Sequence, residues 1–98
     1  MNTANLQLEG LYAAVGSLVS ALREKGVLSS EEIERALAGT EARLASEPER
    51  PSTLSPAHVD AICFPVRYLR LANRLEAEGT HLPFSELARR IGRDKPDH

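Results

Sequence analysis

The fold of this chain is decided by the stretch Lys25-Gly26-Val27-Leu28-Ser29-Ser30-Glu31-Glu32-Ile33, which ends one helix and begins the next. Gly26 can adopt a positive φ without steric cost, so it suits the position just after a helix end. Lys25 offers a cation to the last helical carbonyls. Ser29 and Glu32 have the spacing of a capping box. The stretch therefore predicts two helices joined by a tight turn, an αα-hairpin over residues 5–45.

Apolar residues around the same turn support this interpretation. Val27 can fold back onto the last turn of the first helix, as often happens beyond a glycine cap. Leu28 and Ile33 lie on either side of the expected N-cap, at the spacing of a hydrophobic staple.

The first helix carries an apolar arc that is wider than one small neighbour can cover. Its residues follow a 3-4-3-4 heptad pattern, widened by two more positions. The second helix offers only Ile33, Leu37 and Leu44 opposite it. The arc is either an ordinary core face or also a dimer seam, and its residues are Leu8, Leu11, Tyr12, Val15, Leu18, Val19 and Leu22. A row of small residues beside it would let a neighbouring backbone come close: Gly10, Ala14, Ser17 and Ala21.

After the hairpin, residues 46–54 predict a linker, because two prolines and several polar residues disfavour a regular element. Ser55 and Pro56 form a strong helix start, so a third helix is expected over 55–78, with Gly79 as its stop. Pro65 lies inside this helix and predicts a kink or a short break near Phe64.

A short fourth helix is expected over residues 83–91, with Gly92 ending it. Residues 93–98 predict a mobile tail. Residues 1–98 therefore make a single all-α domain, a small helical bundle built from the hairpin, a Pro-kinked third helix and this short fourth helix.

Composition limits the function classes. The net charge of -2 argues against general attraction to nucleic acid or to anionic membranes. The single Cys cannot form an internal disulfide and suits a reducing compartment. The longest uncharged stretch, residues 10–22, is too short to cross a bilayer, and no signal peptide precedes it. These features predict a cytoplasmic protein that does not enter membranes.

Few residues have the pattern of a reactive site. His58, His81, His98 and Cys63 do not have metal-ligand spacing, so no metal or cofactor is expected. The carboxylate pair at residues 31 and 32 is explained by the helix dipole, and a chain this short rarely encloses a catalytic cleft. We therefore expect no enzymatic activity.

Three arginines form the best candidate for a binding patch. Arg67, Arg70 and Arg74 lie three and four residues apart, which places them on one face of the third helix. Such a face is either a solvated surface or a patch for an anion, a nucleic acid or an acidic partner.

Part of the chain resembles a known helical hairpin. The hairpin near the middle of nitrile hydratase beta subunits shares Leu11-Tyr12, Leu18, Leu22, Glu24-Lys25-Gly26-Val27-Leu28 and Glu31-Glu32-Ile33. Short helical-hairpin modules of many bacterial proteins share the same turn signature. In nitrile hydratase the segment is scaffold for subunit assembly, so the resemblance over residues 8–44 implies architecture and no activity.

A second resemblance covers residues 84–92. This segment resembles the first helix and turn of a helix-turn-helix DNA-binding unit. The recognition helix that would enter the major groove is not expected in the six residues that follow.

The sequence thus favours a small non-enzymatic interaction or accessory protein that works as a homodimer and presents a polar surface to a protein partner of unknown identity. The alternative is a nucleic-acid or anion binder that uses the Arg67, Arg70 and Arg74 face and the basic C-terminus.

Overall fold

The computed structural model describes residues 3–46 and 56–93, and these ranges contain four helices and no strand. The helices are α1 (Thr3–Glu24), α2 (Ser30–Ala45), α3 (Pro56–Ala77) and α4 (Phe84–Arg93). The predicted all-α bundle is therefore confirmed. Apart from Ser46 and Arg93, the predicted linker and the predicted mobile tail lie outside the described residues.

The turn between α1 and α2 forms as the sequence predicts. Gly26 has a φ of 73°, its N–H donates to the carbonyl of Arg23 at 3.1 Å, and the N–H of Val27 donates to the carbonyl of Leu22 at 3.0 Å. This pair of bonds is a Schellman motif. Ser29 and Glu32 form both hydrogen bonds of the capping box, at 2.8 and 3.1 Å.

The side chain of Val27 does not follow the prediction. It is 65% exposed, so its expected packing on the last turn of α1 is wrong. The two backbone hydrogen bonds close the turn without it.

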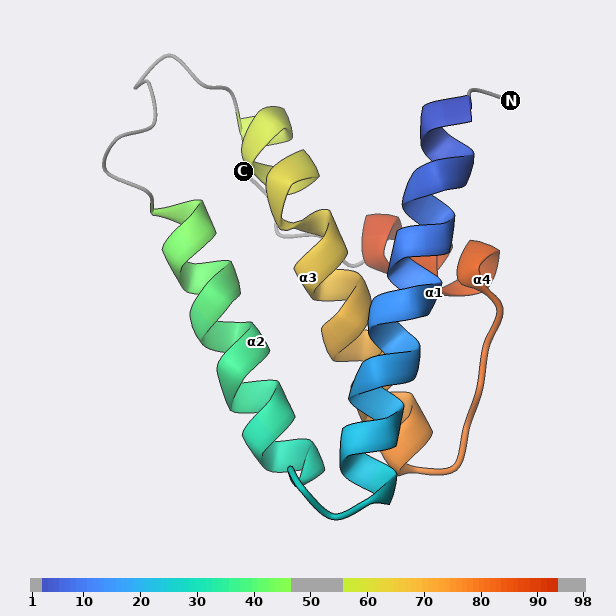
Figure 1. Ribbon diagram of the computed structural model, residues 1–98. Helices are drawn as coiled ribbons and strands as arrows, with labels where there is room; N and C mark the ends of the chain where they lie inside the picture. Colours follow the sequence, from blue (N-terminus) through green and yellow to red (C-terminus); the bar gives the residue numbers. More distant parts are fainter. Residues whose placement is uncertain (1–2, 47–55, 94–98) are drawn as a thin grey trace.

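α3 is the central helix of the bundle, with α1 and α2 on either side of it (Figure 1). The prediction that Ile33, Leu37 and Leu44 of α2 lie opposite the apolar arc of α1 is wrong, because α1 and α2 diverge from their turn and have little contact with each other. Instead, α2 packs closely along α3, and α4 packs against α3 at the other side of the bundle.

The course of α3 and the end of α4 also differ from the predictions. α3 runs through Pro65 without a break, so of the two predicted alternatives the short break is wrong. Proline removes one helical hydrogen bond, to the carbonyl of Ala61, and that residue is exposed to water. α4 continues past Gly92 to Arg93, because a glycine weakens a helix without necessarily ending it. Gly79, with a φ of 87°, does follow the end of α3 as predicted.

Candidate functional site

The residues of the candidate dimer seam on α1 separate into an inner and an outer group. Tyr12 is buried, and Val15 and Val19 are half-buried. The four leucines remain open to solvent, with exposed fractions of 46% for Leu8, 56% for Leu11, 66% for Leu18 and 37% for Leu22. Most of the predicted seam is therefore uncovered in a single copy of the chain.

Aromatic packing explains why Tyr12 faces inward. Its ring stacks on Tyr68 at a centroid distance of 5.1 Å and on Phe84 at 5.5 Å, and it lies 6.1 Å from Phe64. The chain has two Tyr and two Phe, so all of its aromatic rings gather where α1, α3 and α4 meet. Burial here raises the pKa of Tyr12. This cluster sets which face of α1 is turned toward the core.

Polar contacts fix the other end of α1. Ser20 donates to the Glu76 carboxylate at 2.6 Å, and Arg23 donates to the Asn73 side-chain oxygen at 2.6 Å. Arg23 also pairs with Glu76 at 3.3 Å. Together with the aromatic cluster, these contacts hold α1 against α3 along one line. Because α-helical residues are separated by about 100°, the leucines lie to the side of that line.

The uncovered side of α1 carries no charge from residue 10 to residue 22. The row of small residues, Gly10, Ala14, Ser17 and Ala21, is also exposed there. The interpretation that a neighbouring backbone explains Gly10 is wrong within one copy, because a Cβ at this position would have no atom within 4 Å. The outer faces of α2 and α4 are charged, as is usual for surface helices. The exposed face of α1 differs from them because it carries no charge.

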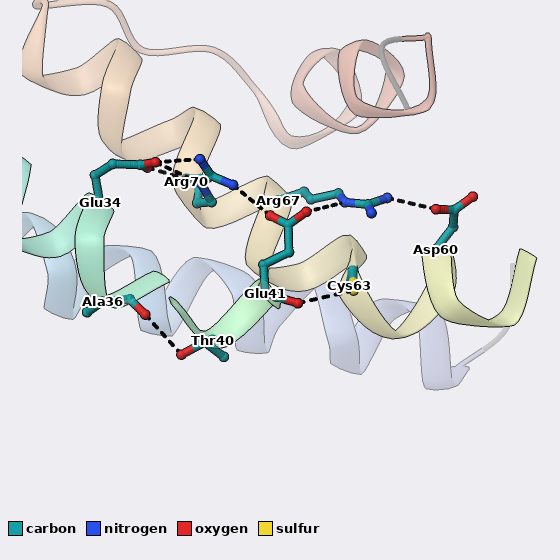
Figure 2. Close-up of polar contacts among 8 residues, drawn as sticks. All are labelled: Glu34, Ala36, Thr40, Glu41, Asp60, Cys63, Arg67 and Arg70. Carbon is teal, nitrogen blue, oxygen red and sulfur yellow. Dashed lines mark hydrogen bonds and ion pairs between the residues drawn. The ribbon is translucent and has the colours of Figure 1, made fainter. Parts of the chain in front are cut away.

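The arginine patch is mostly neutralised by the protein itself (Figure 2). Arg67 pairs with Glu41 at 2.8 Å and with Asp60 at 3.0 Å. Arg70 donates to Glu34 at 3.0 Å and to Glu41 at 2.8 Å. The bonds to Glu34 and Glu41 join α2 to α3, while the Arg67–Asp60 pair lies within α3. Two of the three predicted patch residues therefore serve the fold.

The third patch residue, Arg74, is exposed and has a different environment. It lines a hollow of about 900 Å³ between α2, α3 and α4. Arg35 and Arg90 also line this hollow, but so do Glu31, Glu34 and Glu78. The mixture of both signs gives the hollow little net preference for an anion.

The ion pairs have a clear electrostatic effect on Glu41. Burial acts to raise the pKa of its carboxyl, but the hydrogen bonds from Arg67 and Arg70 outweigh burial and hold the pKa below its ordinary value. The hydrogen bonds that Arg70 donates to Glu34 and Glu41 in turn raise the pKa of Arg70. Glu41 therefore keeps its charged form at neutral pH.

One structurally central residue was missed by the sequence analysis. Asn73 is only 3% exposed; it accepts from Arg23 of α1 and donates to the carbonyl of Ser30 at 3.1 Å. It therefore links α1, the start of α2 and α3. A polar residue on the inner face of α3, next to Ala72, was the available signal.

The candidate reactive residues are dispersed. Cys63 is fully buried between α2 and α3, and its thiol lies 3.9 Å from the carbonyl oxygen of Glu41. His58 and His81 are exposed, while His98 lies outside the described residues. Within residues 3–46 and 56–93, no group of three or more His, Cys, Asp or Glu side chains could hold a metal ion. None of the helices in these ranges is long and apolar enough to cross a membrane.

No protein family, curated protein or solved structure matches this chain. The resemblance of residues 8–44 to the nitrile hydratase hairpin therefore stays a prediction.

Proposed function

We propose that this chain is a small non-enzymatic interaction protein that works as a homodimer, with α1 as the contact between the two copies. The exposed leucines of α1 carry the proposal, since they lie on a helix face without charge. The charged outer side of α2 and α3 remains available to a protein partner. We place the protein in the cytoplasm, where a buried thiol such as Cys63 stays reduced.

The expected affinity follows from the leucines. Fully burying a leucine contributes about 1.5–3 kcal/mol, so burying the exposed half of four leucines on each copy contributes on the order of 10 kcal/mol. Association costs about 4–15 kcal/mol in lost freedom. The two are similar in size, so the dimer should be weak and should form at micromolar or higher concentration.

Sedimentation equilibrium at about 100 μM tests the proposal, because a weak dimer is populated at that concentration. Leu18→Glu should raise the dissociation constant at least about tenfold, since it places a charge in an apolar contact. Leu18 is 66% exposed, so the protomer itself should remain folded.

Ala13→Glu is the matched control, because it adds the same charge to an exposed position of α1 that belongs neither to the seam nor to the row of small residues. It should leave the dimer intact. A monomer mass for the unmutated chain, or equal effects of the two variants, would contradict the proposal.

The alternative function, anion or nucleic-acid binding through the arginine patch, has less support. Arg67 and Arg70 already bind carboxylates of the same chain, which leaves Arg74. Binding to duplex DNA that weakens steeply with salt would favour this alternative, since phosphate contacts release counterions.

A further inference from the structure

We infer that the two copies of α1 pair antiparallel and side by side along almost their whole length, with Leu8 of one copy against the partner's Leu18. This inference rests on the homodimer proposed above. It adds the orientation and the register of the contact, and each is argued from the arrangement of α1 within one copy.

A second α1 is the partner that fits this face. The outer side of α1 is uncharged over residues 10–22, so any charged surface placed on it would lose water without gaining a partner. The outer sides of α2 and α4 carry many charges, and these are better left in water. When two such faces meet, residues 10–22 of each copy bring no charged side chain into the contact.

The heptad pattern determines how the leucines meet. In an antiparallel pair, the two alternating core positions of one helix lie opposite those of the other. One such register places Leu8 against the partner's Leu18 and Leu11 against the partner's Val15. A second register leaves Leu8 beyond the contact.

The size of the contact decides between the two registers. With 22 residues, α1 is about 33 Å long. A single helix face of this length covers less than the roughly 800 Å² per partner of a standard interface. The register that places Leu8 against the partner's Leu18 overlaps the two helices almost completely and buries more area. It is therefore favoured, because the contact is already small.

The surroundings of α1 favour the antiparallel orientation. α2 leaves the turn close to the C-terminal end of α1 and diverges from it toward the N-terminal end (Figure 1). Parallel pairing would bring both turns to the same end of the dimer. Antiparallel pairing places the crowded end of each copy beside the open end of the other, and it also opposes the two helix dipoles.

A hollow near the N-terminal end of α1 also favours the antiparallel orientation. It measures about 340 Å³ and is lined by Asn5, Leu8, Glu9, Tyr12, Phe64 and Phe84, of which Glu9 is charged. Antiparallel pairing brings the partner's Leu18, the most exposed leucine of α1, beside this hollow. Parallel pairing would place two hollows together and leave both unfilled.

Disulfide trapping of the full chain tests the orientation. The variants Leu8→Cys and Leu18→Cys are mixed and oxidised at about 100 μM, where the proposed dimer is populated. A disulfide requires Cβ atoms roughly 3.5–4.5 Å apart. We expect a covalent dimer from the mixture and none above background from either variant alone. Cys63 is fully buried and remains unchanged in every variant.

A mixture of Leu11→Cys and Val15→Cys should also give a covalent dimer, which confirms the register at a second position. A mixture of Leu8→Cys and Ala13→Cys is the matched control and should give none, because Ala13 is exposed but lies outside the seam and the row of small residues. Circular dichroism checks that each variant keeps its helices.

Covalent dimers from Leu8→Cys alone and from Leu18→Cys alone would mean parallel pairing and would overturn the inference while leaving the homodimer intact. Absence of a product from both seam mixtures would overturn it as well. A monomer mass for the unmutated chain would instead remove the homodimer on which the inference rests.

Discussion

At the scale of single residues, backbone conformation at the first turn is a requirement that only glycine meets easily. Gly26 has a φ of 73°, and no atom lies within 4 Å of where its Cβ would be. The constraint on this position is therefore conformational and does not come from crowding. Positive φ is disfavoured most for β-branched residues, which crowd their own backbone.

We predict that Gly26→Val lowers the free energy of unfolding by about 1 kcal/mol or more, because valine resists the positive φ of the cap. Gly39→Ala is the matched control: this glycine lies inside α2 with open space around it, so alanine should stabilise by up to about 1 kcal/mol. Urea unfolding followed by circular dichroism measures both. Equal stability of Gly26→Val and the unmutated chain would contradict the role of Gly26.

Also at this scale, Asn73 shows how one buried side chain can join three helices. Its amide group has a donor and an acceptor, and the structure uses both, toward Ser30 and Arg23. A buried polar group is costly unless it is hydrogen-bonded, so these bonds are what make its position on α3 favourable.

At the scale of elements, α3 combines a helix-breaking residue with a central position. Pro65 lies near the middle of the 22-residue helix, between Cys63 and Val66, which are both buried. Cys63 before it and Arg67 after it contact α2. Phe64 before it and Tyr68 after it pack on Tyr12 of α1. The direction of α3 at this point therefore affects both contacts.

We predict that Pro65→Ala does not stabilise the protein, although alanine is favoured over proline in a helix interior by about 3 kcal/mol. The sequence predicts a kink at Pro65, and with such a kink a straighter α3 would misalign the faces that meet α2 and the aromatic cluster. This loss should offset the gain. An isolated peptide of α3 with the same change should become more helical. A gain of about 3 kcal/mol in the whole protein, with unchanged near-UV circular dichroism, would contradict this account of α3.

At the scale of the whole molecule, charge joins α2 to the rest of the bundle. The Glu41 carboxylate pairs with both Arg67 and Arg70, and hydrogen bonds hold its pKa below the ordinary value of 4.5. The unfolded chain therefore takes up a proton at higher pH than the folded chain does. Stability from this group is present above about pH 4.5 and is lost as the pH falls through the folded pKa.

We predict that the free energy of unfolding falls between about pH 5 and pH 3, and that Glu41→Gln makes this fall shallower. The variant should also be less stable at pH 7 by about 1–3 kcal/mol, because two arginines lose a charged partner. Glu24→Gln on the exposed end of α1 is the control and should leave the profile unchanged. Urea unfolding across this pH range measures all three proteins, and parallel profiles for Glu41→Gln and the unmutated chain would contradict the prediction.

Local sequence signals were enough to predict where the helices of the hairpin meet and where α3 stops. Gly26, the pair Ser29 and Glu32, and Gly79 act through hydrogen bonds that span no more than five residues, so their signals are complete within a short stretch. The existence of four helices follows from the same local preferences and from apolar periodicity.

The covered face of α1 and the binding partners of the arginines depend instead on contacts between distant parts of the chain. The periodicity of α1 predicts Tyr12 and Leu18 on the same apolar arc. Tyr12 packs on rings of α3 and α4 that lie more than fifty residues away in the sequence. This packing turns Leu18 toward solvent. Arg67 and Arg70 likewise meet α2 carboxylates at least 26 residues away. Such contacts depend on how the helices are placed in space, and a local pattern carries no information about that placement.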